Sequence, residues 1–202
     1  MTIYYIIALL AALSWSISSL ISADVTREIG GIPFNRIRLL IVSIILIFYT
    51  TYIDTWHTIN INYLTLIILS GVIGIFLGDT LLFMALQRIG PRRNNILFSL
   101  AAPFTVLLNI YFLNEAMSLS NLAGCFLVFF GVVIAIAYGS NNNKHRWEII
   151  EGSLTLGVLM GIIAALCQAI GLIIMKPILN SGVDPIASAT IRTTISFILL
   201  SF

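Results

Sequence analysis

Long apolar runs separated by short polar segments constrain the fold of this chain more than any other feature. An apolar run of about 20 residues crosses the roughly 30 Å hydrocarbon core of a bilayer as a helix, because a helix satisfies its backbone groups internally. The predicted spans cover residues 3–22, 37–53, 64–87, 95–113, 119–138, 153–175 and 187–202. The expected fold class is all-α, a polytopic transmembrane helix bundle of about seven helices.

Composition supports the same class. Hydrophobic residues make up 59% of the 202 residues and charged residues only 9%, whereas a soluble domain carries roughly a quarter charged residues. This balance excludes an ordinary soluble domain, a disordered chain and a nucleic-acid binder that works through basic patches. The expected environment is a lipid bilayer, and no nucleic-acid partner is expected.

The sequence contains no recognisable catalytic or metal-binding motif. Cys125 and Cys167 lie inside apolar runs and are interpreted as packing residues, and no His, Cys or acidic spacing matches a metal site. We therefore expect no metal, no cofactor and no enzymatic activity. The N-terminal apolar run lacks a basic segment before it, which indicates a retained helix rather than a cleaved signal peptide.

Two parts of the chain resemble each other at a spacing of about 153 residues. Residues 11–18 align with residues 164–171, and the pair Ile37-Arg38 aligns with Ile191-Arg192. We interpret residues 1–139 as a first five-helix repeat, 140–152 as a connecting loop, and 153–202 as two helices of an incomplete second repeat. Because five helices separate the two starts, the second repeat enters the bilayer from the opposite side, as in inverted-repeat transporters.

Basic residues cluster in alternate connecting segments, which bears on orientation. The first, third and fifth segments and their flanks hold eight of them: Arg27, Arg36, Arg38, Arg88, Arg92, Arg93, Lys144 and Arg146. The second, fourth and sixth segments hold only Lys176. The positive-inside rule places the basic segments in the cytoplasm and the N-terminus outside.

A set of short motifs between residues 78 and 131 resembles the EamA family of the drug/metabolite transporter superfamily. The motifs are Gly78-Asp79, Ala85-Leu86, Ile89-Gly90-Pro91, Pro103-Phe104, Leu113-Asn114-Glu115, Gly124 and Gly131. Asn114 stands where the family usually has glycine. The resemblance implies ten helices in two inverted five-helix repeats, with small metabolites moving through a central cavity. It also implies cytoplasmic termini, which conflicts with the charge-based orientation, so the orientation stays open.

The leading hypothesis is therefore a multi-pass small-molecule transporter of the plasma (inner) membrane that works by alternating access. The alternative is a non-transporting truncated remnant, or an incomplete fragment of such a transporter. A seven-helix retinal protein is excluded because the last helix has no Lys for a Schiff base. Substrate, direction, coupling ion and oligomeric state stay open.

Asp79 is the leading candidate for chemistry, because it is the one carboxylate well inside an apolar run. An intramembrane charge is costly and usually faces a cavity or a partner. Asp79 is expected to bind substrate amines or carry a coupling proton, or else to cap a helix break. Arg38 and Arg192, at matched repeat positions, either attract anionic substrates or, as we favour, anchor helix ends at headgroups.

Trp15 and Gln168 also occupy matched positions and either contact substrate or pack against neighbouring helices. Pro103 is expected to bend its helix, which suits a gate or a fixed cavity wall. Two stripes of small residues are expected to let helices approach closely. These stripes contain Gly71, Gly74, Gly78, Gly157 and Gly161.

Overall fold

The computed structural model describes residues 2–114, 117–138 and 150–202, and within these ranges it is helical and contains no strand. The all-α prediction is confirmed. The helices are α1 (Thr2–Ile29), α2 (Gly31–Ile53), the 3₁₀ turn η1 (Trp56–Thr58), α3 (Ile61–Ser70), the π-helix η2 (Gly71–Leu77), α4 (Gly78–Phe98), α5 (Ala101–Leu113), α6 (Leu119–Ala137), α7 (Leu154–Asn180) and α8 (Pro185–Ser201). Glu115, Lys144 and Arg146 lie outside the described residues.

The third and fourth predicted spans meet at Gly90, which has φ 77° and ψ 168° inside α4. Only glycine adopts this backbone region readily, so the chain changes direction there without a loop. The helical rod of α3, η2 and the first part of α4 runs from Ile61 to Ile89. The next span begins at Pro91 and continues, after a turn at Ser99 and Leu100, into α5.

Two segments expected to be loops are largely helical. Residues 24–35 belong to α1 and α2, and the one residue between these helices is Gly30, with φ 90° and ψ 153°. Residues 176–180 continue α7. Hydropathy marks where a span leaves the hydrocarbon, but a helix can continue into the interface because its hydrogen bonds are local. The boundaries predicted for these loops were therefore wrong.

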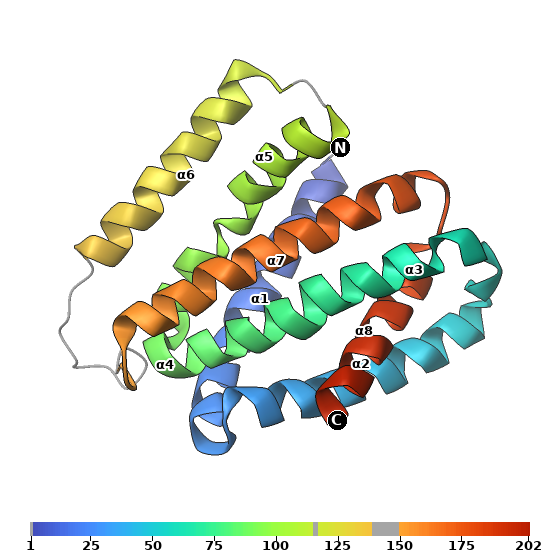
Figure 1. Ribbon diagram of the computed structural model, residues 1–202, viewed down its shortest axis with the longest axis horizontal. Helices are drawn as coiled ribbons and strands as arrows, with labels where there is room; N and C mark the ends of the chain where they lie inside the picture. The colour runs from blue at the N-terminus through green and yellow to red at the C-terminus, as the bar shows by residue number, and fades with distance from the viewer. Residues whose placement is uncertain (1, 115–116, 139–149) are drawn as a thin grey trace.

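The bundle is built around α7, which crosses the middle of the molecule in Figure 1. This helix packs against α3, η2, α4 and α5, while α8 packs against α2 and η2. On the other side of α4 lies α1, and α6 lies at the edge of the bundle beside α5. The centre of the structure is therefore the crossing of α4 and η2 with α7 and α8.

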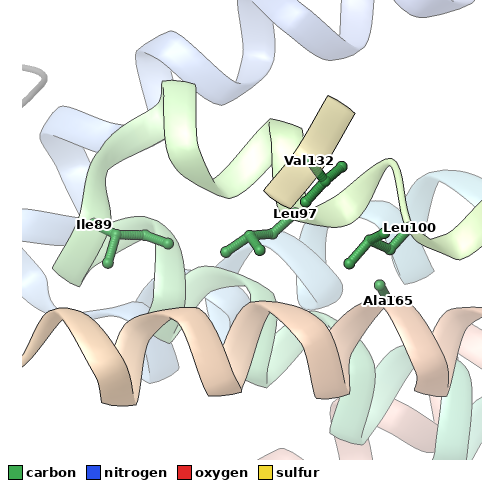
Figure 2. Packing of buried hydrophobic residues seen from close by; sticks show 5 residues of the cluster. All are labelled: Ile89, Leu97, Leu100, Val132 and Ala165. Atoms are coloured by element: carbon green, nitrogen blue, oxygen red, sulfur yellow. The ribbon is translucent and has the colours of Figure 1, made fainter. Parts of the chain in front are cut away.

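One apolar cluster joins α4, α5, α6 and α7, and Figure 2 shows how its side chains converge. The buried members are Ile89, Leu97, Leu100, Val132 and Ala165. Two smaller clusters lie under α3 with α7 and under α1 with α4. Packing of this kind fixes the relative positions of the helices that carry the polar groups described below.

Much of the outer surface is apolar. On α6, the side chains of Phe126, Leu127 and Phe130 are 64%, 74% and 64% exposed. Within the described part of the chain, five helical segments are long and apolar enough to cross a membrane, and α5 and α8 are shorter apolar helices. Large apolar side chains exposed along so many helices require lipid around them. The chain is therefore a multi-pass integral membrane protein.

Contacts between described residues of several connecting segments mark two ends of the bundle. At one end, Arg27 lies 3.6 Å from the carboxylate of Glu151, and the backbone N–H of Glu151 donates to the carbonyl of Arg88 at 2.8 Å. At another end, the backbone N–H of Asp184 donates to the hydroxyl of Thr58 at 3.1 Å. Arg27, Arg88 and Glu151, which belong to the first, third and fifth segments, thus lie at one end, and α1 and α7 begin at opposite ends.

Candidate functional site

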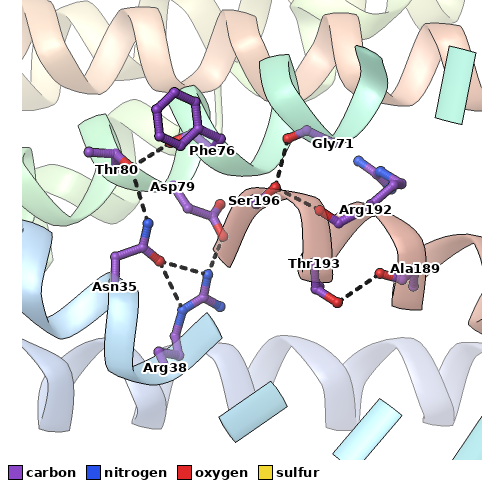
Figure 3. A network of polar contacts seen from close by, with 10 residues as sticks. All are labelled: Asn35, Arg38, Gly71, Phe76, Asp79, Thr80, Ala189, Arg192, Thr193 and Ser196. Carbon is purple, nitrogen blue, oxygen red and sulfur yellow. Dashed lines mark hydrogen bonds and ion pairs between the residues drawn. The ribbon is translucent and has the colours of Figure 1, made fainter. Parts of the chain in front are cut away.

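An ion pair joins Asp79 on α4 to Arg38 on α2, as Figure 3 shows. The side chains are 14% and 29% exposed respectively. The same guanidinium group donates to the amide oxygen of Asn35 at 3.1 Å and lies 5.0 Å from the ring centre of Phe83. Three neighbours, Asp79, Asn35 and Phe83, therefore hold Arg38 between α2 and α4.

Asn35 extends this network to the residue that follows Asp79 on α4. Its amide donates to the hydroxyl of Thr80 at 3.2 Å, and Thr80 donates in turn to the carbonyl of Phe76. Asn35 is fully buried, so its hydrogen bonds are shielded from solvent and fix the orientation of Arg38. Sequence reasoning missed Asn35 because it was assigned to a loop; its spacing of three residues from Arg38 on one helix was the available signal.

Arg192 on α8 lies against the rod, with its guanidinium group next to Gly74. Its charge interacts with that of Asp79. A Cβ atom on Gly74 would lie 3.2 Å from the Nη2 atom of Arg192, and one on Gly71 would lie 2.9 Å from the Arg192 backbone. The structure thus brings together three of the five predicted substrate or coupling residues: Asp79, Arg38 and Arg192.

A narrow polar cavity of about 40 Å³ lies beside Arg38, between α1, α2 and α4. It is lined by Trp15, Ser18, Ser19, Ser22, Arg38, Leu82, Phe83, Leu86, Asn94 and Asn95. Trp15 stacks on Phe98 with ring centres 5.6 Å apart and an interplanar angle of 14°. Within this wall, Ser19 donates to the amide oxygen of Asn95 at 3.0 Å. The cavity therefore combines an aromatic ring, hydroxyls and amides next to a charge.

A larger cavity of about 390 Å³ lies between α5, α7 and α8. It is lined by Thr105, Leu172, Ile173, Met175, Lys176, Leu179, Asn180, Pro185, Ser188 and Arg192. The ammonium group of Lys176 donates to the amide oxygen of Asn109 at 3.4 Å. This cavity has apolar walls and two basic residues, and sequence reasoning did not single out Lys176 as part of a site.

Gln168 and Pro103 lie apart from the charged cluster. Gln168 is partly buried on α7 and does not line either of the two cavities. Pro103 stands in the first turn of α5, directly after the turn at Ser99 and Leu100. Because proline has no N–H and its ring crowds the carbonyl four residues earlier, an uninterrupted helix through Ser99 is disfavoured at this point.

The glycine stripes lie where helices cross. Gly74 and Gly78 of the rod lie against Gly171 and Cys167 of α7, respectively, so the rod and α7 approach closely. Gly157 and Gly161 on α7 face the side chains of Ile89 and Leu97. In the part of the chain that the structure describes, no group of three His, Cys, Asp or Glu side chains is placed to hold a metal ion.

Comparison with known proteins adds one finding. No curated protein and no solved structure matches the sequence. The model of the EamA-like transporter family matches residues 2–137, which is more than half of the chain. These residues include Trp15, Arg38 and Asp79 and all of the motifs that carried the resemblance. The chain therefore belongs to the EamA-like transporter family.

Proposed function

We propose that this chain moves a small molecule across the plasma (inner) membrane by alternating access around Asp79. The observation that carries the proposal is the ion pair between Asp79 and Arg38 inside the membrane-spanning helices. A charged side chain at the centre of a membrane helix costs about 2.5–3.5 kcal/mol on insertion scales. Asp79 and Arg38 are charged despite this cost, and they lie next to a polar cavity. These features favour a role for the pair in substrate binding or ion coupling over a role in packing.

The two cavities support a mechanism with movement. The cavity beside Arg38 has a volume of about 40 Å³, whereas a small-molecule site typically has roughly 300–1,000 Å³. The cavity beside Arg192 has about 390 Å³. Passage of a ligand from one side of the Asp79 cluster to the other therefore requires helices to move apart, and α2, α4 and α8 are the helices whose charges meet there.

The arrangement of the helices fits an inverted repeat. α1 and α7 begin at opposite ends of the bundle, as the predicted duplication requires. The family match ends at residue 137, close to the end of the predicted first repeat. In the proposed cycle, the two repeats rock against each other and expose the Asp79 cluster to the two sides in turn.

Metabolite distributions in expressing cells test the proposal. Cells carrying the wild type, Asp79→Asn, Arg36→Gln or an empty vector are compared by mass spectrometry of cell extract and medium. Arg36 is the matched control because it lies exposed on the same helix as Arg38. We expect the wild type and Arg36→Gln to shift the distribution of the same metabolite, and Asp79→Asn to abolish the shift. A wild type that matches the empty vector, or an Asp79→Asn variant that matches the wild type, contradicts the proposal.

A further inference from the structure

We propose that the cavity between α5, α7 and α8 binds the anionic group of a small amphiphilic molecule through Arg192, and that this group belongs to the transported substrate. The second half of this statement rests on the proposed function; the binding site does not. The inference begins with the charges at the crossing of the rod with α2 and α8. Arg38 forms the ion pair with Asp79, and the guanidinium group of Arg192 lies at the same crossing, beside Gly74 and Gly171. Two cations and one carboxylate leave a net positive charge there.

Asp79 is already engaged. Its carboxylate forms the ion pair with Arg38, whose orientation is fixed by Asn35. Arg192 interacts with Asp79 only through its charge, and among the described residues its buried Nε atom has no hydrogen-bond partner. A buried guanidinium group with unmet hydrogen-bonding capacity is unfavourable. A ligand that supplies a negative charge next to Arg192 removes this cost.

The cavity beside Arg192 has the matching composition. None of α5, α7 and α8 contains Asp or Glu, so no carboxylate of these helices competes for Arg192. Lys176 lines the same cavity and adds a second basic group. Arginine and lysine together favour carboxylate or phosphate groups. The site is therefore selective for an anion.

The other residues that line the cavity indicate that the rest of the ligand is apolar. Leu172, Ile173, Met175 and Leu179 of α7 line the cavity with apolar surface. The volume of about 390 Å³ lies within the range of small-molecule sites, roughly 300–1,000 Å³. A compact molecule with one anionic end and an apolar body fits this lining. An anionic phospholipid presents the same chemistry as a soluble organic anion, so the test must separate these two sources.

Binding to the purified chain in phosphatidylcholine nanodiscs provides the test, with octanoate as the soluble probe. We expect saturable octanoate binding that is at least about tenfold tighter than binding of uncharged octanamide. Arg192→Gln is expected to weaken octanoate binding by about tenfold or more, and Arg192→Lys by less, because lysine keeps the charge but not the planar donors. Arg36→Gln is the matched control and is expected to bind as the wild type. The octanamide comparison uses only wild-type protein, so it stands if a variant fails to fold.

Nanodiscs that contain phosphatidylglycerol distinguish the two sources. Octanoate binding that persists in these discs supports a soluble anion as the ligand. Phosphatidylglycerol that co-purifies with the wild type but not with Arg192→Gln, and that octanoate does not displace, supports the anion site but overturns its assignment to the substrate. Equal binding of octanoate and octanamide, or equal loss in Arg192→Gln and Arg36→Gln, overturns the site. Because binding is measured without transport, none of these results depends on the metabolite experiment.

Discussion

Arg38 on α2 and Asp79 on α4 form an ion pair between two membrane-spanning helices, across a sequence separation of 41 residues. The pair couples the first helical hairpin to the central rod. Arg192 on α8 adds a second cation near this crossing, with its guanidinium group beside Gly74 of the rod and Gly171 of α7. The stability of the bundle and the proposed function therefore depend on the same contact.

Replacing either partner is expected to destabilise the fold. Arg38→Ala and Asp79→Ala each leave one charge buried without its partner, a loss of about 3–5 kcal/mol for fully buried pairs. Both side chains are partly exposed, so we expect each variant to lose about 3 kcal/mol or less in free energy of unfolding. Chemical unfolding in detergent measures each loss. In a double-mutant cycle the coupling energy is expected to be about 0.5–3 kcal/mol, and strictly additive losses would contradict a direct interaction.

Gly71→Ala is expected to push α8 away from the rod. The added Cβ would lie 2.9 Å from both the Cα atom and the carbonyl oxygen of Arg192, so backbone must shift, at a cost of about 1–3 kcal/mol. Thermal unfolding in detergent measures this loss. Gly124→Ala on α6 is the matched control, because nothing lies within 4 Å of its Cβ position. Equal unfolding temperatures for the two variants would argue against close packing at Gly71.

Gly30→Ala and Gly90→Ala are expected to strain the turns that join neighbouring helices. Both glycines have positive φ and extended ψ, 90° and 153° at Gly30 and 77° and 168° at Gly90. Residues with a side chain pay about 1–3 kcal/mol in this region. The free energy of unfolding should fall by that amount in each variant. Gly131→Ala serves as the helical control, since its Cβ position is open; a similar fall there would remove the argument from backbone strain.

Labelling of single cysteines tests which segments share a side of the membrane. Single cysteines are introduced at His57, Asn180, Arg92 and Ser153 in a variant that lacks Cys125 and Cys167. His57 and Asn180 lie at one end of the bundle, and Arg92 and Ser153 lie at the other. The positive-inside rule predicts that a membrane-impermeant maleimide applied to intact cells labels only His57→Cys and Asn180→Cys. The reverse pattern would favour the orientation implied by the family. Labelling of one member of each pair would refute the shared ends.

The helical class and most spans could be predicted from sequence, because a membrane helix is recognised from its own apolar length. Asp79 could also be singled out, since a carboxylate inside an apolar run is conspicuous. Its partner was harder to predict. Whether Arg38 contacts a lipid headgroup or the carboxylate of Asp79 depends on the rotation of α2 relative to α4. That rotation is set by contacts between residues far apart in sequence, such as Asn35 and Thr80.

The loop boundaries failed for a related reason. Polar and charged residues from Asp24 to Asn35 look like a loop because they interrupt an apolar pattern. In the structure, several of these residues face protein: Thr26 and Asn35 are fully buried. Hydropathy cannot distinguish a polar residue that faces water from one that faces a polar neighbour inside the bundle. The cavity beside Arg192 was missed similarly, since it combines residues from three helices.

The π-helix at Gly71–Leu77 ends one residue before Gly78 and two before Asp79. Each α-helical residue turns the chain by about 100°. The directions of all later side chains on the rod therefore depend on how many residues this segment contains. An insertion or deletion of one residue between Gly71 and Leu77 would rotate Asp79 by more than a quarter turn, away from Arg38. The length of this irregular segment therefore sets the direction of the Asp79 side chain, which carries the only carboxylate of this span.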